Sequence, residues 1–257
     1  MTNTEQLYYI SPTNLLNMKY FFAVIVALLF AGCAKNTQID FTGTTPGIST
    51  GTFMIRDIRK DSIICQADIK SGKFDVSRKL NYPGYYYMLI TKPGIGTMGY
   101  DVYLEAGQYT VITNRDKPYK YPDIQSTSKK QNELSAYYHL CDTVNDAIHK
   151  KVHDLSARID TLKKSVAPAN SYTDVINKLK AAQQQEAEPG LIALSAFVDK
   201  YPDNEIAPRL MLLNNAYQAD PQAYYKIYQK LGTATKNSSS GKELQYWLSQ
   251  SIPVNSK

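Results

Sequence analysis

The spacing of hydrophobic residues in this 257-residue chain changes near residue 126. From Ile39 to Thr113, short apolar or alternating runs are separated by Gly, Pro, Asn and Asp, a pattern typical of strands joined by turns. From Ser126 onward, apolar residues recur in steps of three and four, which is the spacing of one face of a helix. The sequence therefore predicts an α+β fold, with an N-terminal antiparallel β-sandwich over residues 39–116 and an all-helical module over residues 126–252.

Seven strands are expected in the first part, joined as up-and-down hairpins with no crossover helix. Ser71-Gly72 and Asn81-Tyr82-Pro83-Gly84 carry the residues of tight reversals. The expected strands are Ile39–Gly43, Gly51–Ile58, Ser62–Ile69, Lys73–Leu80, Tyr85–Thr91, Gly99–Glu105 and Gln108–Thr113.

A long amphipathic helix opens the second part, and its apolar stripe includes Cys141, Val144, Ile148 and Val152. We expect this stripe to pack on the strands or, alternatively, to be covered by the later helices. Asp220-Pro221 and a capping box from Ser240 to Glu243 predict two helix starts. The further helices are expected near Tyr172–Ala187, Leu191–Lys200, Ile206–Ala219, Gln222–Leu231 and Lys242–Ser251.

The N-terminal region carries an export signal. Met18-Lys19 precedes an apolar run from Tyr20 to Ala31, whose 12 residues cover about 18 Å as a helix, too short for a hydrocarbon core of roughly 30 Å. Residues 1–32 therefore read as a signal peptide, with Met18 as the expected true start. The segment Leu29-Phe30-Ala31-Gly32-Cys33 resembles the lipobox of bacterial lipoproteins, although Phe30 replaces a smaller aliphatic residue. This resemblance implies lipidation of Cys33, a tether over residues 33–38 and a place in the cell envelope.

Net charge gives no sign of a nucleic-acid partner. The formal charge of +6 divides evenly, with 12 basic against 9 acidic residues over 33–125 and 16 against 13 over 126–257. A nucleic-acid-binding surface would require a concentrated basic stripe, which this distribution does not provide.

Several strand and turn motifs resemble a known family. They are Ile39–Gly43, Gly51–Ile55, Ala67–Val76, Pro83–Met88 and Tyr103–Val111. Together they resemble the N-terminal domain of unknown function in bacterial thiol:disulfide interchange lipoproteins, in which a helical segment similar to Lys129–Ser251 follows. In that family a thioredoxin-like domain with a Cys-x-x-Cys pair normally comes next, and this sequence ends at Lys257, where that domain would begin. No residue here inherits the redox role.

Two motifs resemble chemical sites without meeting their requirements. Gly94 to Gly99 spells GxGxxG but leads into a strand, whereas a phosphate cradle must open a helix, so a hairpin loop is expected. His149 and His153 have the i, i+4 spacing of metal ligands, yet both fall on the solvated flank of the long helix, and Lys150 replaces the glutamate of a metalloprotease. We therefore predict no catalytic residue, no metal site and no cofactor.

Two cysteines remain after Cys33. Cys65 lies in a strand and Cys141 in the helical stripe, so either a disulfide links them or they are two separately buried thiols. The tyrosines Tyr85, Tyr86, Tyr87, Tyr100, Tyr103 and Tyr109 offer rings that stack on sugars or, alternatively, pack in half-buried strands.

The sequence thus predicts a lipid-anchored envelope protein, expected at the outer membrane, that acts as a non-catalytic interaction or accessory module with a protein partner. One alternative is a truncated or split thiol:disulfide oxidoreductase whose thioredoxin-like domain is lost or encoded separately. Another is a surface binder of glycans or peptides.

Overall fold

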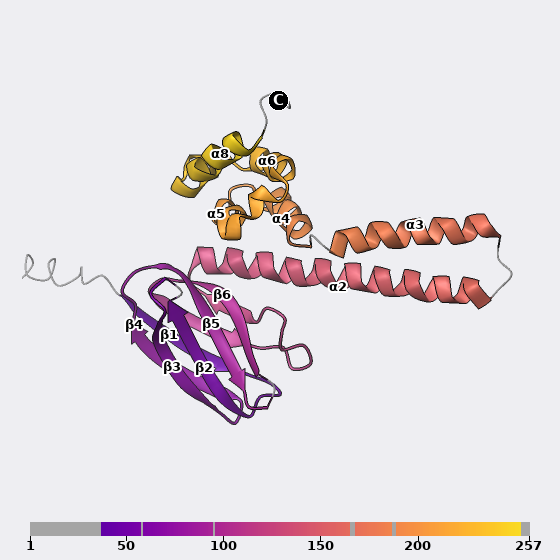
Figure 1. Cartoon of the computed structure of the whole chain (residues 1–257). Helices are drawn as coiled ribbons and strands as arrows, with labels where there is room; N and C mark the ends of the chain where they lie inside the picture. The colour runs from indigo at the N-terminus through magenta and orange to yellow at the C-terminus, as the bar shows by residue number, and fades with distance from the viewer. Residues whose placement is uncertain (1–36, 58, 95, 165–167, 187–188, 253–257) are drawn as a thin grey trace, which may run out of the picture. The chain divides into compact units, whose positions relative to one another are not determined.

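The computed structural model describes residues 37–57, 59–94, 96–164, 168–186 and 189–252 (Figure 1). Strands occupy its first part and helices the rest, so the predicted combination of α and β structure is confirmed. The signal peptide, Cys33 and most of the tether lie outside the described residues. The strands are β1 (Gln38–Thr44), β2 (Thr50–Asp57), β3 (Ser62–Lys70), β4 (Lys73–Lys79), β5 (Gly84–Lys92), β6 (Gly96–Leu104), β7 (Gly107–Ile112) and β8 (Asp123–Ser126).

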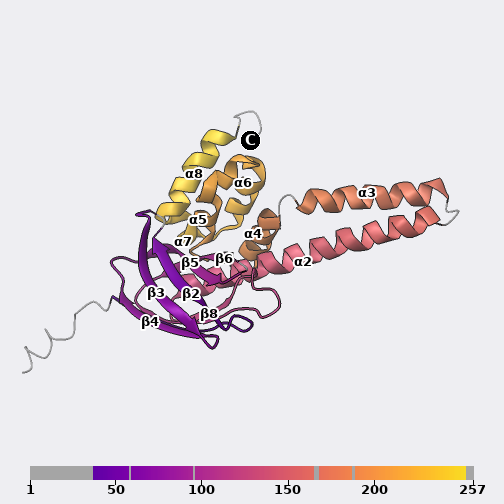
Figure 2. The same cartoon turned by 60° about the horizontal axis from the view of Figure 1, so that its bottom comes forward.

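The strands form one curled sheet in the order β6-β5-β2-β3-β4-β1-β7-β8 (Figure 2). The predicted up-and-down order is wrong: β2 pairs with β5, and β1 pairs with β4 and, in parallel, with β7. Tight turns determine the pairing of strands that follow one another in the sequence. The other pairings depend on burial of side chains that are distant in sequence, which no local pattern encodes.

The curl of the sheet brings three phenylalanine rings together on its inner face. The rings of Phe41 on β1 and Phe53 on β2 lie 5.1 Å apart, and those of Phe53 and Phe74 on β4 lie 4.1 Å apart and nearly parallel. β1 and β2 are not neighbours in the sheet, so these rings meet because the sheet folds over its own inner face. Each buried ring contributes on the order of 2 kcal/mol.

Strand β8 was not expected from the sequence. It has four residues, of which Ile124 is buried in the core of the sheet, and it pairs with β7. It begins after the end of the predicted strand domain, residues 39–116. A single apolar residue in four gives no periodicity to detect.

The helices follow from residue 129. Their bounds are α2 (Lys129–Lys164), α3 (Ala169–Glu186), α4 (Pro189–Lys200), α5 (Ala207–Leu212), the 3-10 helix η1 (Leu213–Gln218), α6 (Pro221–Lys230), α7 (Thr233–Asn237) and α8 (Ser239–Ser251). The long helix α2 runs alongside α3 in both views (Figures 1 and 2), and it also packs on α4. Cys141 and Val144 join the helical core, to which the strands contribute Tyr103. The later helices are therefore the main cover of the stripe.

Two of the predicted helix boundaries need correction. The helix expected over Ile206–Ala219 is divided into α5 and η1, and within η1 Asn215 adopts the left-handed φ of 55°. The capping box at Ser240 is wrong, because the N-cap of α8 is Ser238, which accepts a hydrogen bond from the Gly241 amide. The cap at Asp220 is confirmed: its carboxylate accepts from the Ala223 amide at 2.9 Å.

Gln131 joins the first turn of α2 to the sheet. This side chain is fully buried, and its carbonyl oxygen accepts a hydrogen bond from the Tyr103 amide of β6 at 2.7 Å. Its amide nitrogen donates to Tyr121 Oη and Ser135 Oγ, at 3.1 and 3.0 Å. The strands and α2 are therefore linked through a fully satisfied polar group.

Across the described ranges, no helix combines the length and the apolar character needed to cross a membrane.

Candidate functional site

The pairing between β3 and β4 stops almost as soon as it begins. Among the described residues, Lys70 and Lys73 are the single Cα partner pair between these two strands. On their other sides both strands are fully engaged, β3 with β2 and β4 with β1. Beyond the Lys70–Lys73 pair, the facing edges of β3 and β4 are therefore open. We call this opening the seam.

The closed end of the seam is held by its turn. Ser71 and Gly72 have φ values of 51° and 74°, the two left-handed residues of a type I′ hairpin. The Gly72 carbonyl accepts from the Thr45 amide at 2.8 Å, and the Gly72 amide donates to the Ser49 carbonyl at 3.1 Å. These bonds attach the turn to the loop between β1 and β2, so the closed end of the seam is fixed in place.

Backbone groups point into the seam in a predictable order. Residues that flank a two-residue turn exchange backbone hydrogen bonds, and the next residues oriented the same way lie two positions further along each strand. On β4 these are Asp75 and Ser77, and on β3 they are Asp68 and Gln66. Because no β3–β4 pair is formed beyond Lys70 and Lys73, the N–H and C=O groups of these four residues have no strand partner across the seam.

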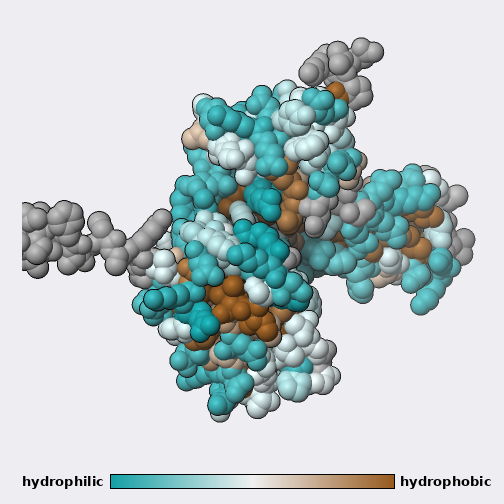
Figure 3. Space-filling view, turned by 60° about the vertical axis from the view of Figure 1, so that its left-hand side comes forward, coloured by the Kyte–Doolittle hydropathy of each residue, from teal (hydrophilic) through white to brown (hydrophobic). Residues whose placement is uncertain are grey.

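A cleft of about 820 Å³ lies at the seam. β3 and β4 contribute charged and apolar side chains to it, and β1 and β7 contribute Thr42, Thr44, Thr110 and Ile112. Ile112 is one of the exposed large apolar side chains of the described part, with 38% of its surface accessible. Figure 3, seen from the side on which β4 lies in Figure 1, shows apolar surface exposed between hydrophilic patches of the strand-bearing part.

The apolar floor of the cleft is rigid. Phe74 is 5% exposed, stacks on Phe53 and borders the cleft next to Ala67. A Cβ atom on Gly43, its partner in β1, would lie 2.2 Å from the Phe74 ring. Only glycine fits beneath the ring at this position, so the local sequence fixes where the ring lies.

The charges of the cleft follow an order along the seam. Lys70 and Lys73 lie at the closed end, and Asp68 and Asp75 follow toward the open end. Lys70 Nζ is 3.8 Å from Asp68 in an exposed pair, and no ion pair of Lys73 is found within the described ranges. The closed end is therefore the part of the cleft best suited to an anionic group.

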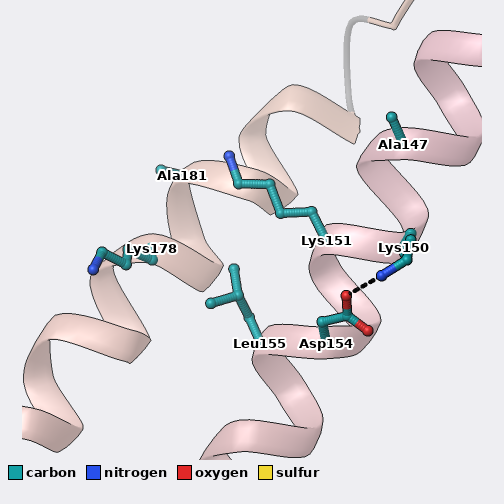
Figure 4. Close-up of a pocket in the computed structure, with 7 residues that line it drawn as sticks. All are labelled: Ala147, Lys150, Lys151, Asp154, Leu155, Lys178 and Ala181. Carbon is teal, nitrogen blue, oxygen red and sulfur yellow. Dashed lines mark hydrogen bonds and ion pairs between the residues drawn. The ribbon is translucent and has the colours of Figure 1, made fainter.

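A second cleft, of about 610 Å³, lies between α2 and α3 (Figure 4). Its three lysines already have partners: Lys150 donates to Asp154 at 2.6 Å, Lys178 to Asp174 at 2.7 Å, and Lys151 to Gln185 at 3.5 Å. Unlike the seam, it presents no open strand edge. We therefore take the cleft at the seam as the candidate site.

The two cysteines within the described residues lack the properties of a reactive thiolate. Cys65 lies in the core of the sheet and Cys141 packs against the helical core, and both are free thiols. Burial raises the pKa of each thiol to about 11. The two thiols thus lie in separate clusters, Cys65 buried and Cys141 half-buried, and neither has the lowered pKa of a redox nucleophile.

His149 and His153 lie on the exposed flank of α2, as expected. His149 Nδ1 is 2.9 Å from Glu186 Oε1, and His153 Nδ1 is 3.7 Å from Asp154 Oδ1. Within the described ranges, no three His, Cys, Asp or Glu side chains gather as metal ligands.

The GxGxxG segment forms part of a hairpin, and most of the six tyrosines are buried. The segment from Gly94 to Gly99 leads through the β5–β6 hairpin, where Lys92 pairs with Gly96, so the predicted hairpin is confirmed. Of the six tyrosines considered as a stacking platform, four are buried: Tyr86, Tyr100, Tyr103 and Tyr109.

The residues of the seam were not singled out by sequence reasoning. Ser71-Gly72 predicted the turn between β3 and β4, but a tight turn ordinarily implies a continuous ladder behind it. The only available signal was the charged character of Lys73, Asp75 and Lys79 on alternate positions, which is typical of an edge strand.

In comparisons with known proteins, the sequence matches no family model and no curated protein.

Proposed function

We propose that this chain is a lipid-anchored protein of the cell envelope and that its described part is a non-catalytic module that binds another protein at the seam. The anchor is Cys33, at the exit of the apolar run from Tyr20 to Ala31. The curled sheet serves as a sandwich-like binding domain, and the helices form its accessory module.

The observation that carries the binding role is the open seam. Unpaired strand edges attract other polypeptides, and proteins ordinarily protect them. Here two such edges face each other over an apolar floor. Evidence against the redox alternative comes from the thiols, because exchange requires a reactive thiolate with a resolving partner close by, and Cys65 lies in the core of the sheet whereas the half-buried Cys141 packs against the separate helical core.

The glycan alternative has less support. Sugar binding by stacking requires an exposed aromatic face. Phe74, the aromatic residue that borders the cleft, is 5% exposed and already stacked on Phe53.

Fatty-acid labelling tests the anchor. Cells that express the full chain should incorporate labelled fatty acid into it, and Cys33→Ala should abolish the label. A single acyl chain holds a protein only marginally, so the wild type should also stay in the membrane fraction, as expected for several chains. Equal labelling of the two proteins would reject the anchor.

Photo-crosslinking in cells tests the binding role. We place p-benzoylphenylalanine at Ile112, on the rim of the cleft, and as a matched control at Tyr246 on α8, which is 58% exposed. A docking site at the seam predicts a discrete crosslinked species from position 112 that is missing from position 246. The same pattern from both positions, or no species from position 112, would reject the proposal.

A further inference from the structure

We infer that the occupant of the cleft is an extended segment of another polypeptide, which adds as a strand to the open edge of β4 and places a carboxylate beside Lys73. This inference rests on the proposed binding function and specifies the chemistry of the partner at the same site.

The backbone of β4 supports strand addition. Asp75 and Ser77 direct their N–H and C=O groups into the seam, and β1 holds the opposite edge of β4 in a seven-pair register from Gln38↔Lys79 to Thr44↔Lys73. The open edge is therefore supported from behind along its whole length, as a template for an added strand must be. The partner supplies the hydrogen bonds that β3 does not make.

The side chains around the seam define the pattern of the segment. Successive residues of a strand point to opposite faces, so alternate side chains of the segment face the floor formed by Ala67 and Phe74. The others face solvent beside the threonines of β1 and β7. The floor-facing positions of the segment are therefore expected to be apolar.

The charges set the direction in which the segment binds. Lys73 lies at the closed end, where no ion pair of this residue is found within the described ranges, and Asp75 lies next to it on the same face of β4. Charge complementarity therefore places an Asp, Glu or C-terminal carboxylate at the Lys73 end and a neutral or basic residue opposite Asp75.

The test uses the full chain with the photo-crosslinking residue at Ile112. Three substitutions are compared in this background: Asp75→Pro, Asp75→Ala and Lys73→Glu. Proline removes the backbone N–H of residue 75 from the seam and is tolerated on an edge, whereas alanine removes the same carboxylate and keeps the N–H. Strand addition predicts that Asp75→Pro lowers crosslinking at least about fivefold further than Asp75→Ala, which loses the same carboxylate but keeps the backbone N–H. Lys73→Glu should lower crosslinking about fivefold or more, because the introduced glutamate repels the carboxylate of the partner segment.

Each variant is first checked by circular dichroism and thermal melting. If Asp75→Pro does not fold, Ser77→Pro against Ser77→Ala repeats the comparison at the next amide that faces the seam. Mass spectrometry of the crosslinked peptide should identify an extended segment of another protein with a carboxylate within a few residues.

The outcomes separate the two claims. Equal crosslinking of Asp75→Pro and Asp75→Ala, whether kept or lost in both, overturns strand addition while leaving a binding site at the seam. Crosslinking to a second copy of this chain, or to a segment without a carboxylate, overturns the stated partner chemistry. Absence of any crosslink from position 112 in the unsubstituted chain rejects the proposed function itself.

Discussion

Burial determines what Cys65 and Cys141 can do chemically. A thiol reacts as its thiolate, and with the pKa raised to about 11 very little of either thiol is ionised at pH 8. The sequence predicted the positions of both residues, a strand and an apolar stripe, and left open whether they are bridged. It carried no information on their pKa, because that depends on neighbours supplied by the whole fold.

We predict that both thiols of the native protein react slowly with a thiol reagent at pH 8 and react fully in urea. The folded state disfavours the thiolate, so the stabilisation that these groups give is complete below pH 9 and is lost as pH rises toward 11. The labelling rate should rise steeply over the same range. A native cysteine that reacts at pH 8 as fast as in urea would contradict the burial described above.

Gln131 is the polar residue on which the contact between strands and helices depends most. We predict that Gln131→Ala lowers the free energy of unfolding by about 2 to 4 kcal/mol, because the buried Tyr103 amide loses its acceptor and Tyr121 Oη loses a donor. Gln125→Ala is the matched control, since the side chain of this exposed glutamine of β8 makes, among the described residues, a single long contact of 3.4 Å to Asp123. Urea unfolding measures both, and equal losses would show that Gln131 has no special role.

At the scale of elements, local patterns located seven strands and most helices but not how they are connected. Alternation and turns are local signals, so β1 to β7 were expected close to where they lie. The pairing of β1 with β7 and of β2 with β5 brings together side chains that are distant in sequence, such as Phe41 and Tyr109, whose rings lie 5.0 Å apart, and Phe53 opposite Ile90, and alternation does not encode these contacts. The seam escaped prediction for the same reason, because it exists only where two hairpin strands diverge.

The start of α8 allows a direct test at this scale. Ser238 accepts a hydrogen bond from the Gly241 amide at 3.0 Å and donates one to the Thr235 carbonyl at 2.7 Å. We predict that Ser238→Ala lowers the free energy of unfolding by about 1 kcal/mol, whereas Ser240→Ala changes it by less than about 0.5 kcal/mol. A larger loss at Ser240 would restore the capping box expected from the sequence.

At the scale of the whole molecule, the sheet is completed by residues beyond the predicted strand domain. Tyr121 and Ile124 belong to the core of the sheet, and Gln131 satisfies an amide of β6. We therefore predict that the fragment Ala34–Asp116 does not unfold with the cooperativity of the longer fragment Ala34–Lys257. Circular dichroism during thermal melting tests this, and a cooperative transition of the shorter fragment at the same temperature as the longer one would show that the strands fold independently.

The candidate site also belongs to the whole molecule. Its walls come from four strands, and its open edges arise from the path of β3 relative to β4. The sequence predicted an interaction module through the resemblance of its strand motifs and through the expected export signal. It could not indicate where a partner would bind, because no single segment contains the site.

Amide hydrogen exchange of the purified protein tests the open seam most directly. The amides of Asp75 and Ser77 face the seam and should exchange rapidly, whereas those of Phe74 and Val76 bond to β1 and should be protected. Alternation between fast and slow amides along β4 is the result that our account predicts. Protection of Asp75 and Ser77 as strong as that of Val76 would mean that β3 and β4 form a closed ladder, and the binding site proposed for this protein would not exist.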